Sequence, residues 1–406
     1  MEIPKDWKII SLEKVARIQT GLAKGKKGLR NVVNLPYLRV ANVQDGYLDL
    51  SEIKEIEVDS NQVDRYLLQD KDLLLTEGGD FDKLGRGSLW HCQISPCLHQ
   101  NHVFVVRVNN AKLTPYFFSQ QVSSFYGKAY FLSCAKQTTN LASINSTQLK
   151  EFPVLLPPLL EQHKIADILL VWDKSINLLE KLITAKRKLK MGLMQQLLTG
   201  EKRFKEFENS SWKNVSIGEI AELTAGGTPN TNIPEYWNGD IPWMKSGDIS
   251  LKRVRNVKGR ITPTGLSNSS TKKIPAYSVL IALAGQGKTR GSVAINEIEV
   301  CTNQSIAAIM ANPNKLYSEY LYYNLESRYN ELRRLSSGDG GRGGLNLKIL
   351  SQIKISLPIL AEQKKISSIL FTTDEKISTL EKQLSAYKQQ KRGLMQQLIT
   401  GKKRLN

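Results

Sequence analysis

The chain has 406 residues, of which 41% are hydrophobic and 23% charged, a composition that indicates a folded globular protein rather than a disordered one. Its 57 Lys and Arg residues exceed its 38 Asp and Glu residues, and a formal charge of +19 favours a polyanionic partner, most often nucleic acid. No apolar stretch reaches the roughly 20 residues of a membrane span, the N-terminus lacks the apolar region of a signal peptide, and four cysteines make no disulfide framework. We therefore expect a cytoplasmic protein that does not associate with membranes.

Residues 1–155 predict a first domain of mixed α/β structure. Apolar runs at 73–78 and 102–108 are typical of strands, and the segment that opens at Pro115 is typical of a short helix. The tetrad from Asn34 to Tyr37 resembles the loop with which adenine methyltransferases hold a flipped base. No glycine-rich cofactor loop accompanies it, so we expect a structural turn there.

The densest set of potential metal ligands lies in the same domain and consists of His91, Cys92, Cys97, His99 and His102. Their spacing is not a regular zinc spacing. The second half of the chain retains only Cys301, so the common architecture does not require a metal, and we expect none.

Residues 156–205 predict one long helix. Apolar residues recur there at spacings of three and four, and no proline interrupts them after Pro157-Pro158. Those prolines mark the expected start and Gly200 the expected end. An uninterrupted helix of about 38 residues would be about 57 Å long, which is too long for a packed domain interior.

Residues 206–356 predict a second α/β domain, with strands at 277–284 and 304–311 and a helical stretch from Tyr317 to Tyr329. The sequence GQGKT at 285–289 suggests a phosphate-binding loop. That motif requires a glycine six residues before the lysine, where this chain has Ala282, and the residues after it are typical of a strand rather than a helix. We therefore expect this loop to contact DNA rather than a nucleotide.

Residues 357–406 predict a second long helix, and it repeats the first. Residues 161–204 and 362–405 are identical at about half of their positions without a gap, including GLMQQL and the closing Thr-Gly. Two helices with apolar seams are expected to pair as an antiparallel coiled coil, because as separate surface helices each seam would stay exposed to water.

The repeat extends into the two α/β domains. Trp7-Lys8 recurs as Trp212-Lys213, and Leu35–Arg39 recurs as Ile241–Lys245. Cys97 with Gln100 recurs as Cys301 with Gln304. The segments between these anchors differ almost completely. We therefore expect two similar α/β domains of one topology, separated by two long helices, in a pseudo-two-fold repeat of mixed α/β class.

The shared motifs identify a family resemblance. They are GLMQQLLTG at 192–200 and GLMQQLITG at 393–401, each downstream of Pro-x-x-x-Glu-Gln-x-Lys-Ile, together with the segments at 226–249 and 285–295. In this combination the chain resembles the specificity subunit of type I restriction–modification systems. The first α/β domain matches the pattern of the family less closely than the second.

The resemblance implies two target-recognition domains, each of which reads one half of a split site in double-stranded DNA. It also implies that the two helices space these domains and bind two modification subunits, which carry S-adenosylmethionine and methylate adenine. Up to two motor and nuclease subunits, which use ATP and magnesium, would join for cleavage. The chain itself would hold no cofactor and no catalytic residue.

Basic and amide side chains of the variable regions are the candidates for DNA contact, because they suit phosphates and base edges. The candidates are Lys24, Lys26, Lys27, Arg30, Arg39, Arg86, Gln100, Asn101, Lys245, Gln286, Lys288, Thr289, Arg290, Asn303, Gln304 and Arg342. The basic residues from Lys252 to Arg260 are further candidates for phosphate contact.

Matching positions in the two domains carry amides, Gln100-Asn101 in the first and Asn303-Gln304 in the second. Such side chains can bond an adenine edge bidentately, or they can close a loop by a structural hydrogen bond. The sequence leaves both interpretations open.

The repeated GLMQQL blocks supply the candidates for partner contact, namely Leu193, Met194, Leu197, Leu394, Met395 and Leu398. The sequence thus favours a non-catalytic DNA specificity subunit. The alternative is an enzyme that modifies nucleic acid at its own active site, either an adenine methyltransferase or a nucleotide-driven enzyme.

Overall fold

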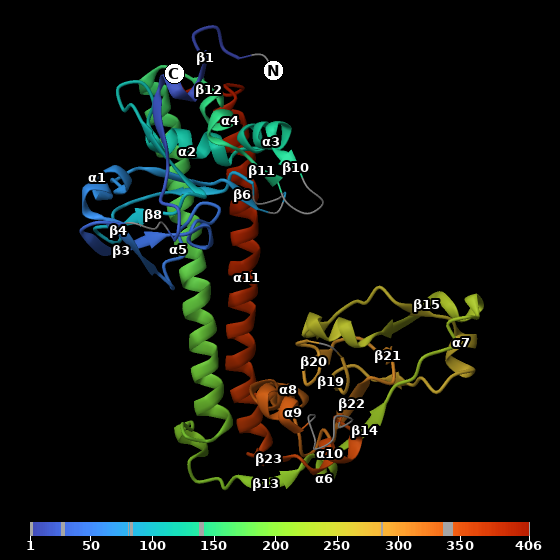
Figure 1. The fold of residues 1–406 in the computed structure, drawn as a ribbon. Helices are drawn as coiled ribbons and strands as arrows, with labels where there is room; N and C mark the ends of the chain where they lie inside the picture. Colours follow the sequence, from blue (N-terminus) through green and yellow to red (C-terminus); the bar gives the residue numbers. More distant parts are fainter. Residues whose placement is uncertain are drawn as a thin grey trace. The chain divides into compact units, whose positions relative to one another are not determined.

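The computed structural model describes residues 3–25, 29–79, 81, 84–137, 142–285, 287–335 and 344–405. The chain divides into two units, unit 1 with residues 1–180 and 382–406 and unit 2 with residues 181–381 (Figure 1). Each unit contains one globular α/β region and half of each long helix. The predicted mixed α/β class with two long helices is confirmed, and each unit draws on segments that are far apart in the sequence.

The two long helices are α5 (Leu159–Leu198) and α11 (Leu360–Ile399). Helix α5 starts directly after Pro158 and α11 starts two residues after Pro358, and each ends two residues before a glycine, Gly200 or Gly401. Both glycines have positive φ angles, 76° and 70°, which a glycine adopts without steric cost. At Gly401 the backbone also lies so close to Pro4 that an added Cβ would be 2.6 Å from the proline ring.

The globular region of unit 1 is built from short strands and helices. Its strands are β1 (Lys8–Ser11), β2 (Ala16–Thr20), β3 (Val32–Leu38), β4 (Lys54–Asp59), β5 (Leu73–Thr76), β6 (Gly78–Gly79), β7 (Gly87–Leu89), β8 (Leu98–His99), β9 (Val103–Val108), β10 (Lys136–Gln137), β11 (Ala142–Ser143) and β12 (Pro153–Leu156), and its helices are α1 (Val63–Tyr66), α2 (Pro115–Ser123), α3 (Phe125–Cys134) and α4 (Ser146–Lys150). The sheets have the orders β2-β9-β5-β7, β4-β3-β8, β1-β12 and β10-β11-β6.

The globular region of unit 2 follows the same plan. Its strands are β13 (Lys213–Ser216), β14 (Ala221–Ala225), β15 (Trp237–Met244), β16 (Arg253–Val254), β17 (Arg260–Ile261), β18 (Lys273–Ile274), β19 (Val279–Ala282), β20 (Val293–Asn296), β21 (Val300–Thr302), β22 (Ile306–Ala311) and β23 (Lys354–Leu357), and its helices are α6 (Ile217–Ile220), α7 (Pro263–Ser267), α8 (Ser318–Ser327), α9 (Tyr329–Leu335) and α10 (Leu347–Gln352). The sheets have the orders β14-β22-β19-β20-β16, β17-β15-β21-β18 and β13-β23.

The strand orders show that the two regions share one topology, as the repeat predicted. In unit 1, β2-β9-β5-β7 corresponds to β14-β22-β19-β20 in unit 2, and the parallel pair β3-β8 corresponds to β15-β21. The strands expected at 73–78, 102–108, 277–284 and 304–311 are present as β5, β9, β19 and β22. The turn expected from Asn34 to Tyr37 is wrong, because these residues form β3 and pair with β4.

The ends of the long helices complete the two hydrophobic cores. In unit 1, Ile165 and Leu169 of α5 and Leu398 of α11 pack with the fully buried aromatic residues of α2 and α3. In unit 2, Ile366 and Leu370 of α11 pack with α8 in the same way. Neither globular region has a complete core without its share of the helices.

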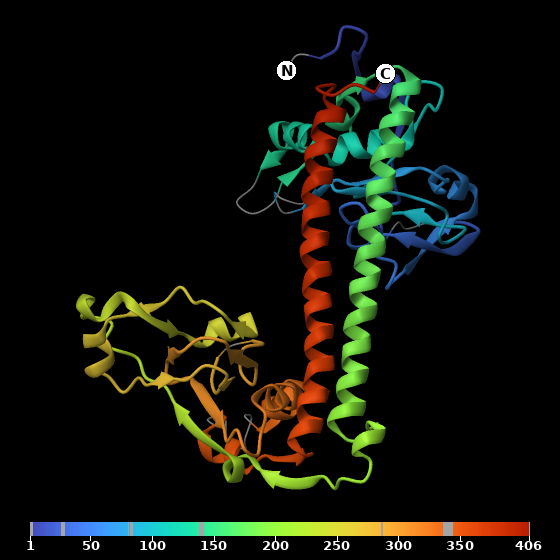
Figure 2. The same ribbon diagram turned by 180° about the vertical axis from the view of Figure 1, so that it is seen from behind.

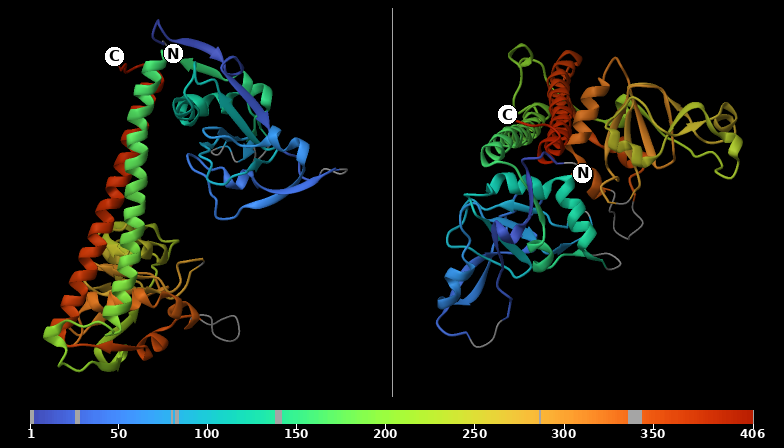
Figure 3. Two further views of the ribbon diagram at one scale, coloured as in Figure 1. Left: turned by 90° about the vertical axis from the view of Figure 1, so that its left-hand side faces the viewer. Right: turned by 90° about the horizontal axis from the view of Figure 1, so that it is seen from above.

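Within each unit the two helix halves run antiparallel (Figures 2 and 3). In unit 1, Asp173 pairs with Lys391 and Glu180 pairs with Lys388, both at 2.6 Å, so the order along one helix is reversed along the other. The rings of Trp172 and Tyr387 meet edge to face in the same unit. In unit 2, Lys190 lies 2.7 Å from Asp374.

A buried glutamate at the start of each long helix holds three distant segments together. Glu161 accepts a bidentate pair of hydrogen bonds from Arg404, at 2.7 and 2.9 Å, and a third bond of 3.1 Å from the indole of Trp7. Glu362 accepts the same pair from Arg203, at 3.0 and 2.7 Å, and a bond of 3.0 Å from Trp212. The repeated Glu, Trp and Lys-Arg positions therefore have one structural role, which we call the glutamate anchor.

The glutamine after each anchor glutamate bonds the residue that precedes α2 in unit 1 and α8 in unit 2. Gln162 accepts a hydrogen bond of 2.9 Å from the Thr114 amide and donates to the carbonyl oxygen of Pro157 at 3.0 Å. Gln363 makes the equivalent bonds to Tyr317 and Pro358, at 2.7 and 2.8 Å. The repeated Pro-x-x-x-Glu-Gln motif is thus explained by the junction between helix and globular region.

We predict that Glu362→Gln lowers the free energy of unfolding by about 3–5 kcal/mol, because it leaves the Arg203 guanidinium facing a neutral amide in a largely buried site. The measurement is urea unfolding of the full chain. Glu206→Gln is the matched control, since it removes an exposed ion pair with Lys365 and should cost less than about 1 kcal/mol. Equal losses in the two variants would contradict a structural role for the anchor.

Candidate nucleic-acid interface

In unit 1 a short turn is held at one edge of the sheets by three neighbouring segments. The backbone N–H of Gln100 donates to Leu38 and that of Asn101 donates to Leu22, both at 2.9 Å. The carbonyl oxygen of His102 accepts a bond of 3.0 Å from the N–H of Glu77. We call residues 100–102 the amide turn of unit 1. Its backbone is fixed from three sides.

Unit 2 repeats this arrangement at residues 303–305, the amide turn of unit 2. Asn303 donates to Met244 at 3.0 Å, and Leu283 donates to Ser305 at 2.8 Å. Gly227 donates to Thr302 at 2.8 Å, as Leu22 donates to His99 in unit 1. Leu283 lies two residues before the GQGKT segment that the sequence linked to DNA contact.

The close approach of the backbone explains two repeated glycines. A Cβ on Gly21 would lie 2.1 Å from the carbonyl oxygen of His99, and one on Gly226 would lie 2.0 Å from that of Thr302. These distances are far below van der Waals contact, so only glycine fits at either position.

The strand pairing corrects the predicted register of the repeat by one residue. Tyr37 pairs with Leu98 in unit 1, and its counterpart Trp243 pairs with Cys301 in unit 2. Cys97 is therefore not the equivalent of Cys301. It follows that Gln100 corresponds to Asn303, and Asn101 corresponds to Gln304.

Exposed basic side chains surround the two amide turns. Lys24 lies two residues after Leu22, Lys245 follows Met244 directly, and Lys288 lies in the loop after β19, and all three are exposed. Arg30 is also exposed, and its backbone N–H donates to Asp59 at 3.2 Å. Lys24, Lys245 and Lys288 thus each lie within a few residues of a segment that bonds an amide turn, whereas Arg30 lies near the opposite end of β3 from Leu38.

Other candidates have structural partners. Arg39 is mostly buried and donates to the carbonyl oxygen of Glu52 at 3.1 Å, and Arg86 donates to Gln44 at 3.1 Å. Thr289 and Arg290 are half-buried in the loop. The candidates Lys26, Lys27, Gln286 and Arg342 lie outside the described residues.

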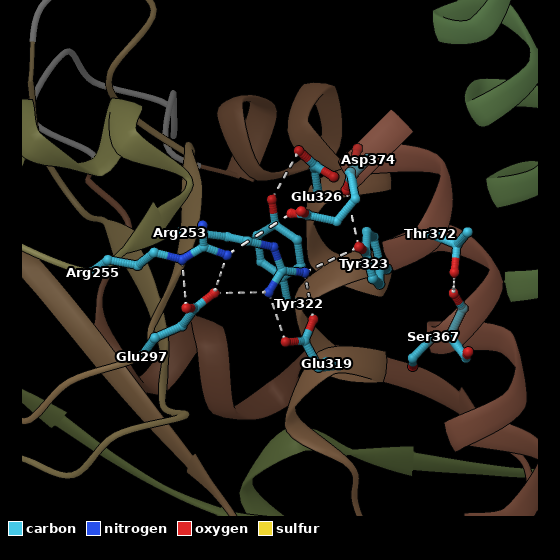
Figure 4. A network of polar contacts seen from close by, with 12 residues as sticks. Arg253, Arg255, Glu297, Glu319, Tyr322, Tyr323, Glu326, Ser367, Thr372 and Asp374 are labelled. Atoms are coloured by element: carbon cyan, nitrogen blue, oxygen red, sulfur yellow. Dashed lines mark hydrogen bonds and ion pairs between the residues drawn. The ribbon is translucent and has the colours of Figure 1, made fainter. Parts of the chain in front are cut away.

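The prediction of phosphate contact is wrong for Arg253, which lies at the centre of a buried polar network (Figure 4). Its guanidinium donates to both carboxylate oxygens of Glu319, at 2.8 and 2.7 Å, and to the hydroxyl of Tyr323 at 3.1 Å. Burial disfavours the charge of Arg253, but Glu319 outweighs this effect and raises the pKa above its usual value. Arg255 is likewise paired with Glu297, at 2.7 Å.

A lysine of α5 extends this network to both long helices. Lys190 lies 2.9 Å from Glu326 and 2.7 Å from Asp374, and the latter also accepts a bond of 2.9 Å from Tyr323. Burial lowers the pKa of Lys190, but the two carboxylates more than compensate and raise it. The network therefore fixes the globular region of unit 2 on its helices.

The potential metal ligands of unit 1 have other roles. Burial raises the pKa of the Cys97 thiol to about 12, so the thiolate that binds zinc is disfavoured. Burial lowers the pKa of His99 to about 4, so the ring is neutral, and its Nδ1 lies 2.8 Å from the carbonyl oxygen of Val103. Among the residues that the structure describes, no three His, Cys, Asp or Glu side chains gather as metal ligands would.

The GQGKT segment also departs from a phosphate-binding loop. The residues after it turn back into strand β20, so no helix N-terminus points toward a phosphate. No helix within the described part of the chain is long and apolar enough to cross a membrane.

The family model of the type I restriction modification DNA specificity domain matches this chain twice, over residues 4–186 and 209–387. The chain belongs to this family. Each match contains one globular region with its amide turn and most of the long helix that follows. The pseudo-two-fold repeat is therefore a pair of type I specificity domains.

Individual relatives agree with this assignment. The putative type I restriction enzyme MjaX specificity subunit of Methanocaldococcus jannaschii is 28% identical over 417 residues, which cover 100% of this chain and 95% of the relative. The EcoR124I/EcoR124II specificity subunit of Escherichia coli is 34% identical over 171 residues, or 41% of each chain. The crystal structure of an S subunit from M. genitalium has the same fold, with a TM-score of 0.61 at 17% identity and 98% coverage of both chains.

Most of the apolar side chains proposed for partner contact are buried in the cores of the two units. Met194 and Leu197 belong to the core of unit 2, and Met395 and Leu398 belong to that of unit 1. Leu193 and Leu394 pack against the same cores. This packing accounts for the repeated apolar pattern, and of the six side chains Leu193 and Leu394 keep part of their surface exposed.

Sequence reasoning missed three polar residues beside the amide turns. The carboxylate of Glu77 lies 2.5 Å from Nδ1 of His102, and the hydroxyl of Thr228 donates to Gln304 at 2.6 Å. His102 was considered only as a metal ligand. Thr228 lies two residues after the repeated Gly226, and this short separation was the one signal in the sequence that pointed to it.

We predict that Lys288→Ala weakens DNA binding by the assembled complex about equally on all sequences, and reduces the slope of log affinity against log salt by about 0.9. The lysine is exposed, so its removal should leave the unfolding transition unchanged. Binding to target and non-target duplexes across a salt series measures this effect.

Arg253→Ala is the matched comparison, because it removes the same charge from the buried network. It should lower the free energy of unfolding by about 3–5 kcal/mol. If it instead reduced only the salt slope, the arginine would be a phosphate contact after all.

Proposed function

We propose that this chain reads a bipartite site in double-stranded DNA, one half with each specificity domain, and so directs methylation by partner subunits. The observation that carries the proposal is the pair of amide turns. Their backbones are held by equivalent hydrogen bonds, whereas the side chains around them differ: Glu77 and His102 in unit 1 correspond to Leu283 and Ser305 in unit 2. One backbone arrangement that carries two different sets of side chains suits the recognition of two different half-sites.

The chain acts in the cytoplasm and performs no catalysis itself. The GQGKT loop leads into a strand, and the tetrad from Asn34 to Tyr37 is itself a strand, which argues against the alternative of a nucleotide-driven enzyme or an adenine methyltransferase. S-adenosylmethionine would be bound by the modification subunits, and ATP with magnesium by motor and nuclease subunits.

The purified chain is expected to show no ATP hydrolysis. Detectable hydrolysis that the substitution Lys288→Ala abolished would overturn this expectation.

Two modification subunits are the expected partners, because a repeated surface binds two copies of one protein. Gly192 and Gly393 occupy the same position in the two GLMQQL blocks, in the interior of α5 and α11. No described atom outside the local helix backbone lies within 4 Å of where a Cβ would be at either glycine. An exposed glycine inside a helix costs about 1 kcal/mol relative to alanine, so its presence in both blocks fits close approach by a partner.

Gly192→Ala and Gly393→Ala are predicted to have opposite effects on the chain and on the complex. Each should raise the free energy of unfolding of the chain by up to about 1 kcal/mol. Each should also weaken assembly with a modification subunit, and the double variant should weaken both binding events. Light scattering would give the stoichiometry, and a stable two-to-one complex with unchanged affinity would contradict the proposed surface.

The division of labour between the domains has its own test. Replacement of residues 1–155 by the corresponding domain of a relative should change one half of the methylated target and leave the other half intact. Methylation-aware sequencing of a randomised DNA library reads both halves at once. A change in both halves would mean that the domains do not read independently.

A further inference from the structure

We propose that Asn101 and Gln304 are the base-reading amides of the two specificity domains, and that neighbouring side chains fix which of their atoms face the DNA. The inference rests on the proposed function. It selects one residue from each amide pair, and it adds His102, Glu77 and Thr228 as positioning residues.

The partner amide of unit 2 is already engaged within the turn. Oδ1 of Asn303 accepts a hydrogen bond of 3.2 Å from the backbone N–H of Ser305 and thus closes the turn. Gln304, by contrast, is exposed. Gln304 is equivalent to Asn101, so the same position carries an amide side chain in both domains.

In unit 1 a chain of three side chains orients Asn101. The Glu77 carboxylate lies 2.5 Å from Nδ1 of His102, and a carboxylate only accepts, so Nδ1 donates to it. Nδ2 of Asn101 lies 3.3 Å from Nε2 on the other side of the ring, and because an amide nitrogen only donates, Nε2 accepts in this arrangement. Oδ1 and the second N–H of Asn101 remain to face the DNA. One acceptor beside one donor matches the N6 amino group and N7 of adenine.

In unit 2 a single hydroxyl orients the equivalent amide in the opposite sense. Thr228 donates to Oε1 of Gln304 at 2.6 Å, so the oxygen is held toward the protein and the two N–H groups face away from it. A pair of donors matches a base edge that offers acceptors, such as N7 and O6 of guanine. The same type of side chain thus reads different bases because different neighbours hold it.

His102→Phe and Thr228→Val test this mechanism, because each keeps a similar side-chain shape, a planar ring or a β-branched side chain, and removes the orienting atom. The assembled complex methylates a randomised duplex library, and sequencing gives the base preference at every position. We expect His102→Phe to reduce a preference of roughly 10- to 100-fold to within about threefold, at one position of one half-site only. Thr228→Val should do the same in the other half-site. The half-site that each variant does not touch serves as its internal control.

Lys24→Ala is the matched control, since it removes a charge near the amide turn of unit 1 and should reduce methylation without altering any base preference. A bipartite wild-type motif with unchanged preferences in both variants would overturn the inference and leave the proposed function intact. A wild-type complex without a bipartite motif would overturn both. Unfolding curves that coincide with that of the wild type show that a loss of preference does not come from loss of the fold.

Discussion

The glutamate anchor is the interaction on which each unit depends. Its carboxylate is almost fully buried, and an arginine fork and an indole N–H occupy its oxygens, which offsets the cost of burying them. Glu161 and Arg404 are 243 residues apart in the sequence, so unit 1 closes only when the last residues of the chain are in place. A bidentate ion pair also fixes the angle between the segments that it joins, which apolar contacts alone would leave less defined.

The duplicated frame tolerates different solutions at equivalent positions. Asp173 with Lys391 in unit 1 corresponds to Asp374 with Lys190 in unit 2. In unit 1 the aspartate is capped by Tyr116 and Gln120, whereas in unit 2 it belongs to the network around Arg253. The helices thus contribute a constant pair of charges, and each globular region completes it with its own side chains. The recognition surfaces of the two regions can therefore differ, because other side chains of each region hold it on the helices.

Much of the architecture was predictable because it rests on local signals. Apolar spacing, the flanking prolines and the glycines at 200 and 401 defined both long helices, and the internal repeat predicted the shared topology. The role of the basic run around Arg253 was not predictable, since its carboxylate partners Glu297 and Glu319 are distant in the sequence. The sequence matched Cys97 with Cys301, but the strand pairing shows that Leu98 is the equivalent of Cys301. A shared cysteine alone does not establish equivalence, because equivalence is defined by the backbone pairing.

The candidate site shows the same limit at the level of single atoms. The sequence located both amide pairs, but the polarity of an amide depends on which of its two ends a neighbour engages. Those neighbours come from other segments: Glu77 follows β5, and Thr228 follows β14. Asparagine and glutamine therefore carry no fixed base code by themselves. On the proposed mechanism, a change in the orienting neighbour would change the base that is read, without any change in the reading residue or in the fold.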